Sequence, residues 1–204
     1  MPTRIRVNVV FDFGNVIFRW DPDRVVARFF DSPPECEKIL SQFIGHDDWQ
    51  ELDRGTLAPS SAIDRAASRT GLPAEKIGRL LDSVPPSLAT IAGSRELLYR
   101  VKAAGHPLYF LSNMHVDSIE HLERTHDFWH VFAGGVVSCR VKMIKPEPAI
   151  YALLLQQYEL DPAATVFIDD LPVNLAAAAK FGMRTIQFVD PAQCERELRA
   201  LGCL

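Results

Sequence analysis

Short apolar runs that alternate with helix-patterned segments constrain the fold of this 204-residue chain more than any other feature. The first run, VNVVF at residues 7–11, consists mainly of β-branched and aromatic residues, which is typical of a strand buried on both faces. Similar runs follow at 106–113, 134–138, 164–168 and 184–189, with helical patterns between them. Strands that alternate with helices predict a parallel sheet covered on both faces.

The stretch between residues 21 and 85 has helical spacing and no convincing strand. Pro33-Pro34, Gly71 and Pro85-Pro86 are among the residues that divide it into several short helices. Because it lies between the first strand and the next strand–helix unit, it is predicted to be an inserted cap. We therefore expect an α/β fold in which residues 1–20 and 86–204 form a Rossmann-like core with a parallel sheet, and residues 21–85 form a helical cap domain.

The composition argues against several classes of protein. A hydrophobic content of 48% allows a full core, whereas a net charge of −4 argues against binding to nucleic acid or to a membrane surface. No apolar run approaches the roughly 18 residues that a membrane span requires, and the first residues lack the apolar stretch of a signal peptide. The four cysteines form no CxxC pair. We expect a cytoplasmic protein with a small-molecule partner.

Polar residues stand at the ends of several apolar runs or in the loops that follow. They are Asp12, Ser112-Asn113, Lys145 and Asp169-Asp170. Because the carboxyl ends of parallel strands meet at one edge of a sheet, these side chains are expected to converge. Carboxylates and a backbone carbonyl are the hard oxygen ligands that Mg²⁺ prefers, and a hydroxyl, an amide and a lysine can donate to a phosphoryl group. Each residue taken alone also fits a helix cap, a turn or a solvated loop.

In chain order, FDFGNV, FLSN, IKPEP and FIDD resemble the four motifs of the haloacid dehalogenase superfamily, subfamily IA, whose first cap type is helical. Within it, FDFGNVIF, LSN, KPEPAIY and FIDDLPVN most resemble the bacterial α-D-glucose-1-phosphate phosphatase group. The resemblance implies that Asp12 is the nucleophile, that Ser112 and Asn113 bind the phosphoryl group and that Lys145 neutralises charge. It further implies Mg²⁺ held by Asp12, the Gly14 carbonyl and Asp169, with Asp170 acting through water or orienting Lys145.

The physical chemistry agrees with these implied roles. An aspartate that attacks a phosphate dianion faces charge repulsion, so the site must supply positive charge. Mg²⁺ and Lys145 would supply it. The expected function is a Mg²⁺-dependent phosphatase that hydrolyses a small phosphorylated metabolite, such as the sugar phosphate α-D-glucose 1-phosphate, through an aspartyl-phosphate intermediate.

Gly14 departs from the family pattern, because most phosphatases of this superfamily carry a second aspartate there. That residue protonates the leaving oxygen and then activates water, and such help is typically worth about 10² to 10⁴ in rate. Its loss favours leaving groups that depart with little protonation, as in anomeric or acyl phosphates. What replaces the carboxyl is left open by the sequence.

Two other functions remain open. A 2-haloacid dehalogenase also lacks the second aspartate, although Asp169-Asp170 would repel a carboxylate substrate unless a cation lay between them. A slow or non-catalytic relative that binds a phosphorylated ligand is the second alternative.

Three residues are candidates for contact with the substrate. Arg19 follows the Asp12 turn, and Trp49 and Arg54 belong to the expected cap. Each has a structural alternative, because Arg19 also stands where the chain enters the cap, and Trp49 and Arg54 fit ordinary helix packing.

Overall fold

The computed structural model describes residues 6–204, so that residues 1–5 of the expected core lie outside it. Its sheet has five parallel strands in the order β3-β2-β1-β4-β5. The strands are β1 (Asn8–Phe11), β2 (Leu108–Ser112), β3 (Phe132–Val137), β4 (Thr165–Asp169) and β5 (Arg184–Gln187). The α/β fold with a parallel sheet is as predicted.

The register of the central strands brings the predicted polar residues to one edge of the sheet. Phe11 of β1 is paired with Phe110 of β2 on one side and with Ile168 of β4 on the other. The next residues along these strands include Asp12 and Asp169, which therefore lie beside each other at the carboxyl ends.

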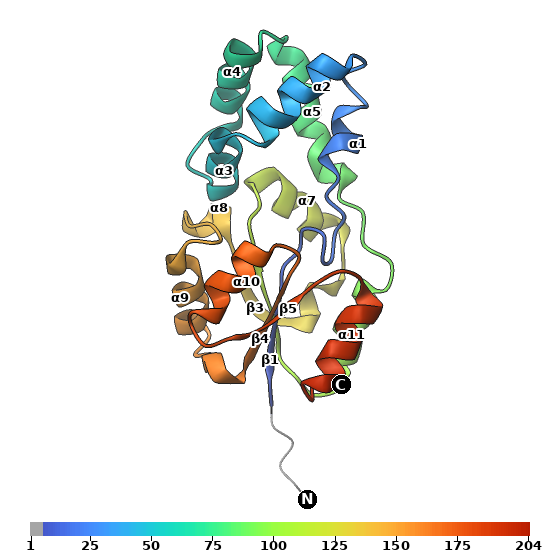
Figure 1. Cartoon of the computed structure of the whole chain (residues 1–204), viewed down its shortest axis with the longest axis vertical. Helices are drawn as coiled ribbons and strands as arrows, with labels where there is room; N and C mark the ends of the chain where they lie inside the picture. Colours follow the sequence, from blue (N-terminus) through green and yellow to red (C-terminus); the bar gives the residue numbers. More distant parts are fainter. Residues whose placement is uncertain (1–5) are drawn as a thin grey trace, which may run out of the picture.

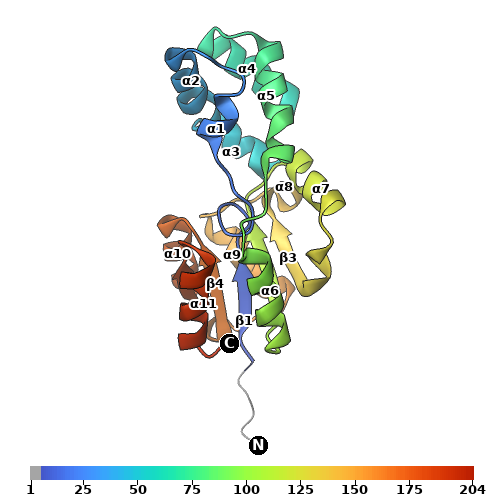
Figure 2. The same ribbon diagram turned by 90° about the vertical axis from the view of Figure 1, so that its right-hand side faces the viewer.

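Helices cover both faces of the sheet (Figures 1 and 2). Helices α6 (Ser94–Ala103), α7 (Val116–Thr125) and α11 (Pro191–Ala200) pack on the face that Val9 and Phe11 enter. Helices α9 (Pro148–Gln157) and α10 (Pro172–Ala179) pack on the opposite face, which Val10 enters. The alternation of side chains along β1 thus explains why its sequence is apolar at successive positions. Within residues 6–204, no helix is both long and apolar enough to cross a bilayer.

A helical unit lies beyond the carboxyl edge of the sheet (Figure 1, top). It consists of α1 (Pro22–Val26), α2 (Pro33–Ile39), a π-helical turn (Leu40–Ile44), α3 (Asp47–Arg54), α4 (Pro59–Thr70) and α5 (Ala74–Ser87). These helices enclose a hydrophobic cluster of their own, which extends from Val25 to Val84. We call this unit the cap; its exact division from the core at residues 20 and 85 remains a proposal.

Helix α5 ends at Ser87, directly after the predicted division at Pro85-Pro86. Both prolines lie in the last turn. There, the missing N–H donors cost the helix little, because only two carbonyls of the preceding turn lose their helical partner.

A buried carboxylate joins two helices of the cap. Asp48 of α3 is 5% exposed, and it accepts hydrogen bonds from Arg65 at 3.1 Å and from Arg69, both on α4. Burial raises the pKa of Asp48, but the hydrogen bonds from Arg69 and Arg65 outweigh burial and lower the pKa below its ordinary value. The ionised form of Asp48 therefore stabilises the cap.

We expect Asp48→Asn to lower the free energy of unfolding by about 2 kcal/mol at pH 7. Because the folded-state pKa of Asp48 is lowered, the advantage of the wild type is complete above the ordinary aspartate pKa of about 3.9. It is lost as the pH falls through the lowered value. Urea unfolding at pH 7 and at about pH 3 measures the difference, with exposed Asp64→Asn on α4 as the control. An equal difference at both pH values would contradict the ion-pair explanation.

Candidate active site at the carboxyl edge of the sheet

Asp12 is held at the end of β1 by its own loop and by the neighbouring strand. Its amide donates to the carbonyl of Ile168 at 2.9 Å, and its Oδ1 accepts from the amide of Phe13 at 2.7 Å. The same Oδ1 lies 2.8 Å from Nζ of Lys145. The Asp12 side chain is thus fixed in orientation and almost fully buried, at 6% exposure of the residue.

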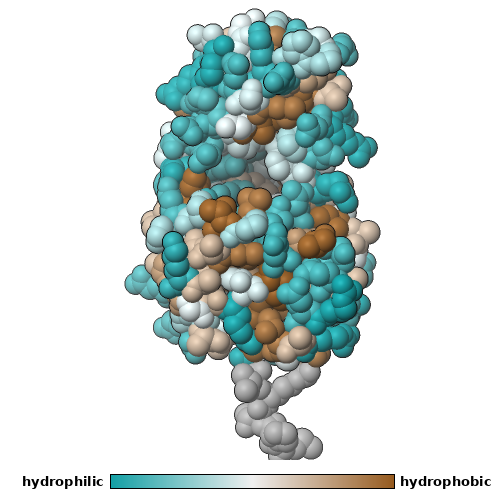
Figure 3. All heavy atoms as spheres, viewed as in Figure 1, coloured by the Kyte–Doolittle hydropathy of each residue, from teal (hydrophilic) through white to brown (hydrophobic). Residues whose placement is uncertain are grey.

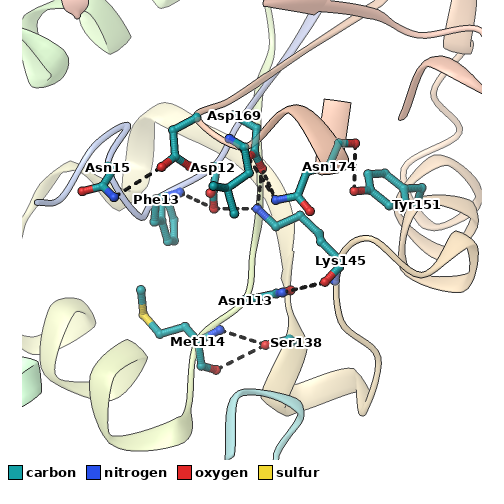
Figure 4. Close-up of polar contacts among 12 residues, drawn as sticks. Asp12, Phe13, Asn15, Asn113, Met114, Ser138, Lys145, Tyr151, Asp169 and Asn174 are labelled. Atoms are coloured by element: carbon teal, nitrogen blue, oxygen red, sulfur yellow. Dashed lines mark hydrogen bonds and ion pairs between the residues drawn. The ribbon is translucent and has the colours of Figure 1, made fainter. Parts of the chain in front are cut away.

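Asn15 fixes the turn that follows Asp12. Its φ of 52° is in the left-handed region that asparagine tolerates better than most residues. Its Oδ1 accepts from the amide of Trp20 at 2.9 Å. Its Nδ2 donates to Oδ2 of Asp170 at 3.3 Å, and this contact is drawn in Figure 4. Asn15 was not predicted as a site residue, although the Gly-Asn pair is a signal for such a turn.

Lys145 bridges the carboxylates of β1 and β4 (Figure 4). Its Nζ lies 2.7 Å from Oδ2 of Asp169 and 2.8 Å from Oδ1 of Asp12. Burial alone would lower the pKa of Lys145, but the charges of Asp12 and Asp169 and the hydrogen bonds to them outweigh it, so the pKa is raised. Lys145 is therefore a charged ammonium group in this site.

Asp169 is fully buried and has further donors. It accepts from the amide of Leu171 at 2.8 Å and from Nδ2 of Asn174 at 3.0 Å to each oxygen. Asn174, in the LPVN segment, is a site residue that the sequence analysis did not single out. Its amide restricts the rotation of the Asp169 carboxylate, which keeps the position of Lys145 fixed as well.

The two polar residues at the end of β2 differ in their contacts. Asn113 accepts from the amide of Lys145 at 2.8 Å and donates to the carbonyl of Lys145 at 2.9 Å (Figure 4). Its side chain thus anchors the Lys145 loop, with one N–H left for another acceptor. Ser112 is 1% exposed, and its Oγ has no hydrogen-bond partner among residues 6–204. A buried hydroxyl without a partner fits a site for an additional polar ligand atom.

Three carboxylates in this site have the geometry for a metal ion. Oxygen atoms of Asp12, Asp169 and Asp170 lie within 4.8 Å of one another. Burial raises the pKa of Asp12 to about 7, with Lys145 opposing this and Asp169 adding to it. Burial and Asp169 also raise the pKa of Asp170. Because three carboxylates face the single ammonium group of Lys145, a divalent cation would balance their charge, so the residues fit Mg²⁺.

Gly14 leaves open space at the position where the resemblance implied a carboxyl group in most phosphatases of the superfamily. A Cβ added at Gly14 would have no heavy atom within 4 Å, and Gly14 is not among the glycines with positive φ. The backbone therefore does not require glycine here.

The cap closes over this edge and leaves a cavity of about 300 Å³ beside Asp12. Its wall includes Gly14, Lys145 and Asp170 from the core and Trp49 and Asp53 from the cap. A smaller pocket of about 90 Å³ adjoins it and shares Gly14, Trp49 and Asp53. On the face shown in Figure 3, hydrophobic side chains border the hollow between the cap and the core.

The structure does not bring the two candidate arginines into the wall beside Asp12. Arg19 is exposed and lines a different cavity, together with Arg24 and Arg28. Both terminal nitrogens of Arg54 bind Glu147 at 2.7 Å, and this ion pair raises the pKa of Arg54. Arg54 therefore joins the cap to the core loop after Lys145. Of the three candidates, only Trp49 lies in the wall of the cavity.

The comparisons with known proteins agree with this geometry. The family model described as haloacid dehalogenase-like hydrolase matches residues 8–182. The sesquiterpene phosphatase astK of Aspergillus oryzae is 29% identical over 197 residues, which cover 95% of this chain and 96% of that protein.

Two solved structures show the same fold. The HAD family enzyme bt-2542 of Bacteroides thetaiotaomicron, in complex with magnesium and inorganic phosphate, has a TM-score of 0.69 at 22% identity, covering 91% of this chain and 95% of its own. The L-2-haloacid dehalogenase of Xanthobacter autotrophicus has a TM-score of 0.64 at 19% identity, covering 96% of this chain and 83% of its own. The same fold thus occurs in an enzyme that binds magnesium and inorganic phosphate and in a haloacid dehalogenase, so the fold alone does not decide the reaction.

Proposed function

Because the chain belongs to the haloacid dehalogenase-like hydrolases, we propose that it is a Mg²⁺-dependent phosphatase that forms an aspartyl phosphate at Asp12. The observation that carries this proposal is the buried arrangement of Asp12, Lys145 and Asp169, with Asp170 within reach of the same ion. A dehalogenase has no need for this concentration of carboxylates, which would repel the carboxylate of a haloacid.

Each residue of the site would have a separate task. The amide of Phe13 and the ammonium group of Lys145 hold Oδ1 of Asp12, which orients the carboxylate for attack on phosphorus through Oδ2. Lys145 also stabilises negative charge on the phosphoryl oxygens, and the free hydroxyl of Ser112 and the second N–H of Asn113 are available donors. Asp12, Asp169 and the Gly14 carbonyl would hold Mg²⁺, with Asp170 acting through water. When bound, the ion offsets the repulsion between nucleophile and substrate.

The wall of the cavity favours an apolar leaving group over the sugar that the sequence suggested. Trp20 and Trp49 stack with ring centroids 5.7 Å apart, and the adjoining pocket is also lined by Val84, Leu88 and Met114. The polar residues of the same pocket are Asp53, Asn113, His115 and Ser118. The apolar side chains offer sugar hydroxyls few partners, and a hydrocarbon chain would bury apolar surface against them. The relative that acts as a sesquiterpene phosphatase has a substrate of this kind. A phosphate monoester of an apolar alcohol is therefore our preferred substrate, ahead of α-D-glucose 1-phosphate.

Phosphate release measured with and without a chelator tests the function. We expect a higher kcat/KM for an isoprenyl monophosphate than for α-D-glucose 1-phosphate. We also expect its hydrolysis to stop in excess EDTA and to return when Mg²⁺ is added. The reason is that the carboxylate cluster and the phosphate dianion repel each other without the cation. The parallel assay measures halide release from 2-chloropropionate.

Equal turnover in EDTA would contradict the metal assignment. Halide release without phosphate release would identify a dehalogenase. Binding of a phosphorylated ligand without any turnover would identify a non-catalytic relative.

A further inference from the structure

Two titratable side chains from distant parts of the chain line the pocket that contains Gly14. Asp53 lies in the last turn of the cap helix α3, and His115 lies just before helix α7, two residues after Asn113. Oδ1 of Asp53 is 3.4 Å from Nδ1 of His115. Both line the pocket of about 90 Å³ that also contains Gly14.

Asp53 also lies in the wall of the cavity beside Asp12. It lines the larger cavity of about 300 Å³, whose wall includes Asp12, Gly14 and Lys145. Its side chain is 18% exposed, whereas that of His115 is 7% exposed. Among the cap residues in this wall, Asp53 carries the carboxyl group, whereas His115 is not part of the wall and is more deeply buried.

The ring of His115 is held on three sides. Its Nε2 lies 2.9 Å from Oγ of Ser118, its Nδ1 faces Asp53, and Trp49 packs against it edge-to-face with centroids 5.9 Å apart. When Nδ1 carries the proton, its N–H donates a hydrogen bond to Asp53, and the hydroxyl of Ser118 donates one to Nε2. Both ring nitrogens then have a partner. A ring fixed in this way can orient the carboxyl group of Asp53.

The backbone of Asp53 is docked onto the core. Oγ of Ser138 donates to the carbonyl of Asp53 and accepts from the amide of Met114 at 2.8 Å, so it joins α3 to the segment that carries His115 (the contact between Ser138 and Met114 is drawn in Figure 4). Nζ of Lys142 donates to the carbonyl of Gly55 at 2.6 Å.

Gly55 permits this close approach. Its φ is 74°, and a Cβ there would lie 2.6 Å from the carbonyl oxygen of Cys139. Together with the Arg54–Glu147 ion pair, these contacts fix the end of α3 against the core, and with it the position of Asp53.

We propose that Asp53, oriented by His115, is the general acid and base that replaces the carboxyl group missing at Gly14. This inference rests on the proposed phosphatase function and adds the residue that handles the proton. Asp53 is then a catalytic residue supplied by the cap, and His115 is a positioning residue.

The proton balance of the reaction closes with this assignment. In the first step the P–O ester bond breaks as Asp12 attacks phosphorus, and the leaving oxygen takes the electron pair and a proton from the Asp53 carboxyl group. In the second step a water molecule attacks the phosphorus of the Asp12 phosphate and gives its proton to the Asp53 carboxylate. The Asp12–phosphorus bond breaks, which releases inorganic phosphate and restores both residues.

Asp53→Asn separates this role from a merely structural one. With an unactivated alkyl phosphate, we expect kcat to fall by about 10²- to 10⁴-fold, because the leaving oxygen receives no proton. With 4-nitrophenyl phosphate, which needs little protonation, we expect a burst of nitrophenol equal to the enzyme concentration and then slow turnover. Intact-protein mass spectrometry should show the added phosphoryl group during this slow phase, because the second step lacks its base.

Two further variants sharpen the experiment. Asp47→Asn, an exposed residue on the same helix, is the matched control and should behave as the wild type. Adding Gly14→Asp to Asp53→Asn should raise kcat for the alkyl phosphate by about 10-fold or more over Asp53→Asn alone. The new side chain has open space at this position. His115→Gln should lower kcat for alkyl phosphates more than for 4-nitrophenyl phosphate, in the same direction as Asp53→Asn but by less.

The outcomes are distinguishable from failure of the proposed function. If the wild type itself releases no phosphate, the phosphatase proposal is wrong. A second outcome is that the wild type is active while Asp53→Asn lowers kcat for both substrates by the same factor, with no burst and no recovery through Gly14→Asp. In that case Asp53 only tethers the cap. Wild-type rates in a folded Asp53→Asn protein would overturn the inference outright.

Discussion

Asp12→Asn is expected to abolish turnover, with a loss of at least about 10⁴-fold in kcat. An amide is a poor nucleophile, so no aspartyl phosphate forms, and one negative ligand for the cation is lost as well. Asp169 cannot take over, because it is held by Lys145, Leu171 and Asn174, and Asp170 accepts a hydrogen bond from Asn15.

The same substitution should leave the metal-free protein as stable as the wild type or more stable. Burial raises the pKa of Asp12 to about 7, which means that the fold disfavours its ionised form at neutral pH. An amide oxygen can still accept from Phe13 and Lys145, as Oδ1 of Asp12 does. The nucleophile is thus a residue whose charge is costly for folding and necessary for chemistry.

Thermal unfolding in EDTA and phosphate release in Mg²⁺ measure both effects on the same sample. Exposed Asp82→Asn on α5 is the control and should change neither. A folded Asp12→Asn protein that keeps more than a small fraction of activity would show that Asp12 is not the nucleophile. A large fall in the melting temperature would show that the charge of Asp12 contributes to the fold instead of weakening it.

The sequence predicted the core part of the site because that part depends on local order and sheet topology. Asp12 and Asp169 follow apolar runs, and parallel strands place such residues at one edge. Lys145 was found through the Lys-Pro-Glu-Pro motif. The side chain of Asn113, which directly follows β2 and lies 32 positions earlier in the chain, holds the Lys145 backbone.

The contacts between the cap and the core were not predictable in the same way. Asp53 and His115 are 62 positions apart, and Arg54 and Glu147 are 93 apart. Whether such residues meet depends on the orientation in which the cap packs on the core. No periodicity or motif in the sequence encodes that orientation. Arg54 is an example. It was predicted to contact the substrate, but an arginine can pair equally well with a carboxylate of the protein, here Glu147.

Lys145→Met is expected to lower both activity and stability, because it removes a buried cation that two carboxylates share. Lys145 is 4% exposed and lies within 2.8 Å of Asp12 and 2.7 Å of Asp169. Without it, these two carboxylates and Asp170 lose their compensating charge, which is worth about 3–5 kcal/mol when one partner of a buried pair is removed. Loss of its contribution to charge stabilisation should lower kcat by about 10²- to 10³-fold.

Magnesium makes this variant informative about the metal as well. A divalent cation bound by Asp12 and Asp169 would supply part of the charge that Lys145 provided, so Mg²⁺ should raise the melting temperature of Lys145→Met more than that of the wild type. Exposed Lys180→Met is the control, and its response to Mg²⁺ should equal that of the wild type. An equal response in Lys145→Met would place the cation away from these carboxylates. Unchanged stability of the variant in EDTA would mean that the carboxylates take up protons when Lys145 is absent, so that the charge balance of the site is set by protons as much as by cations.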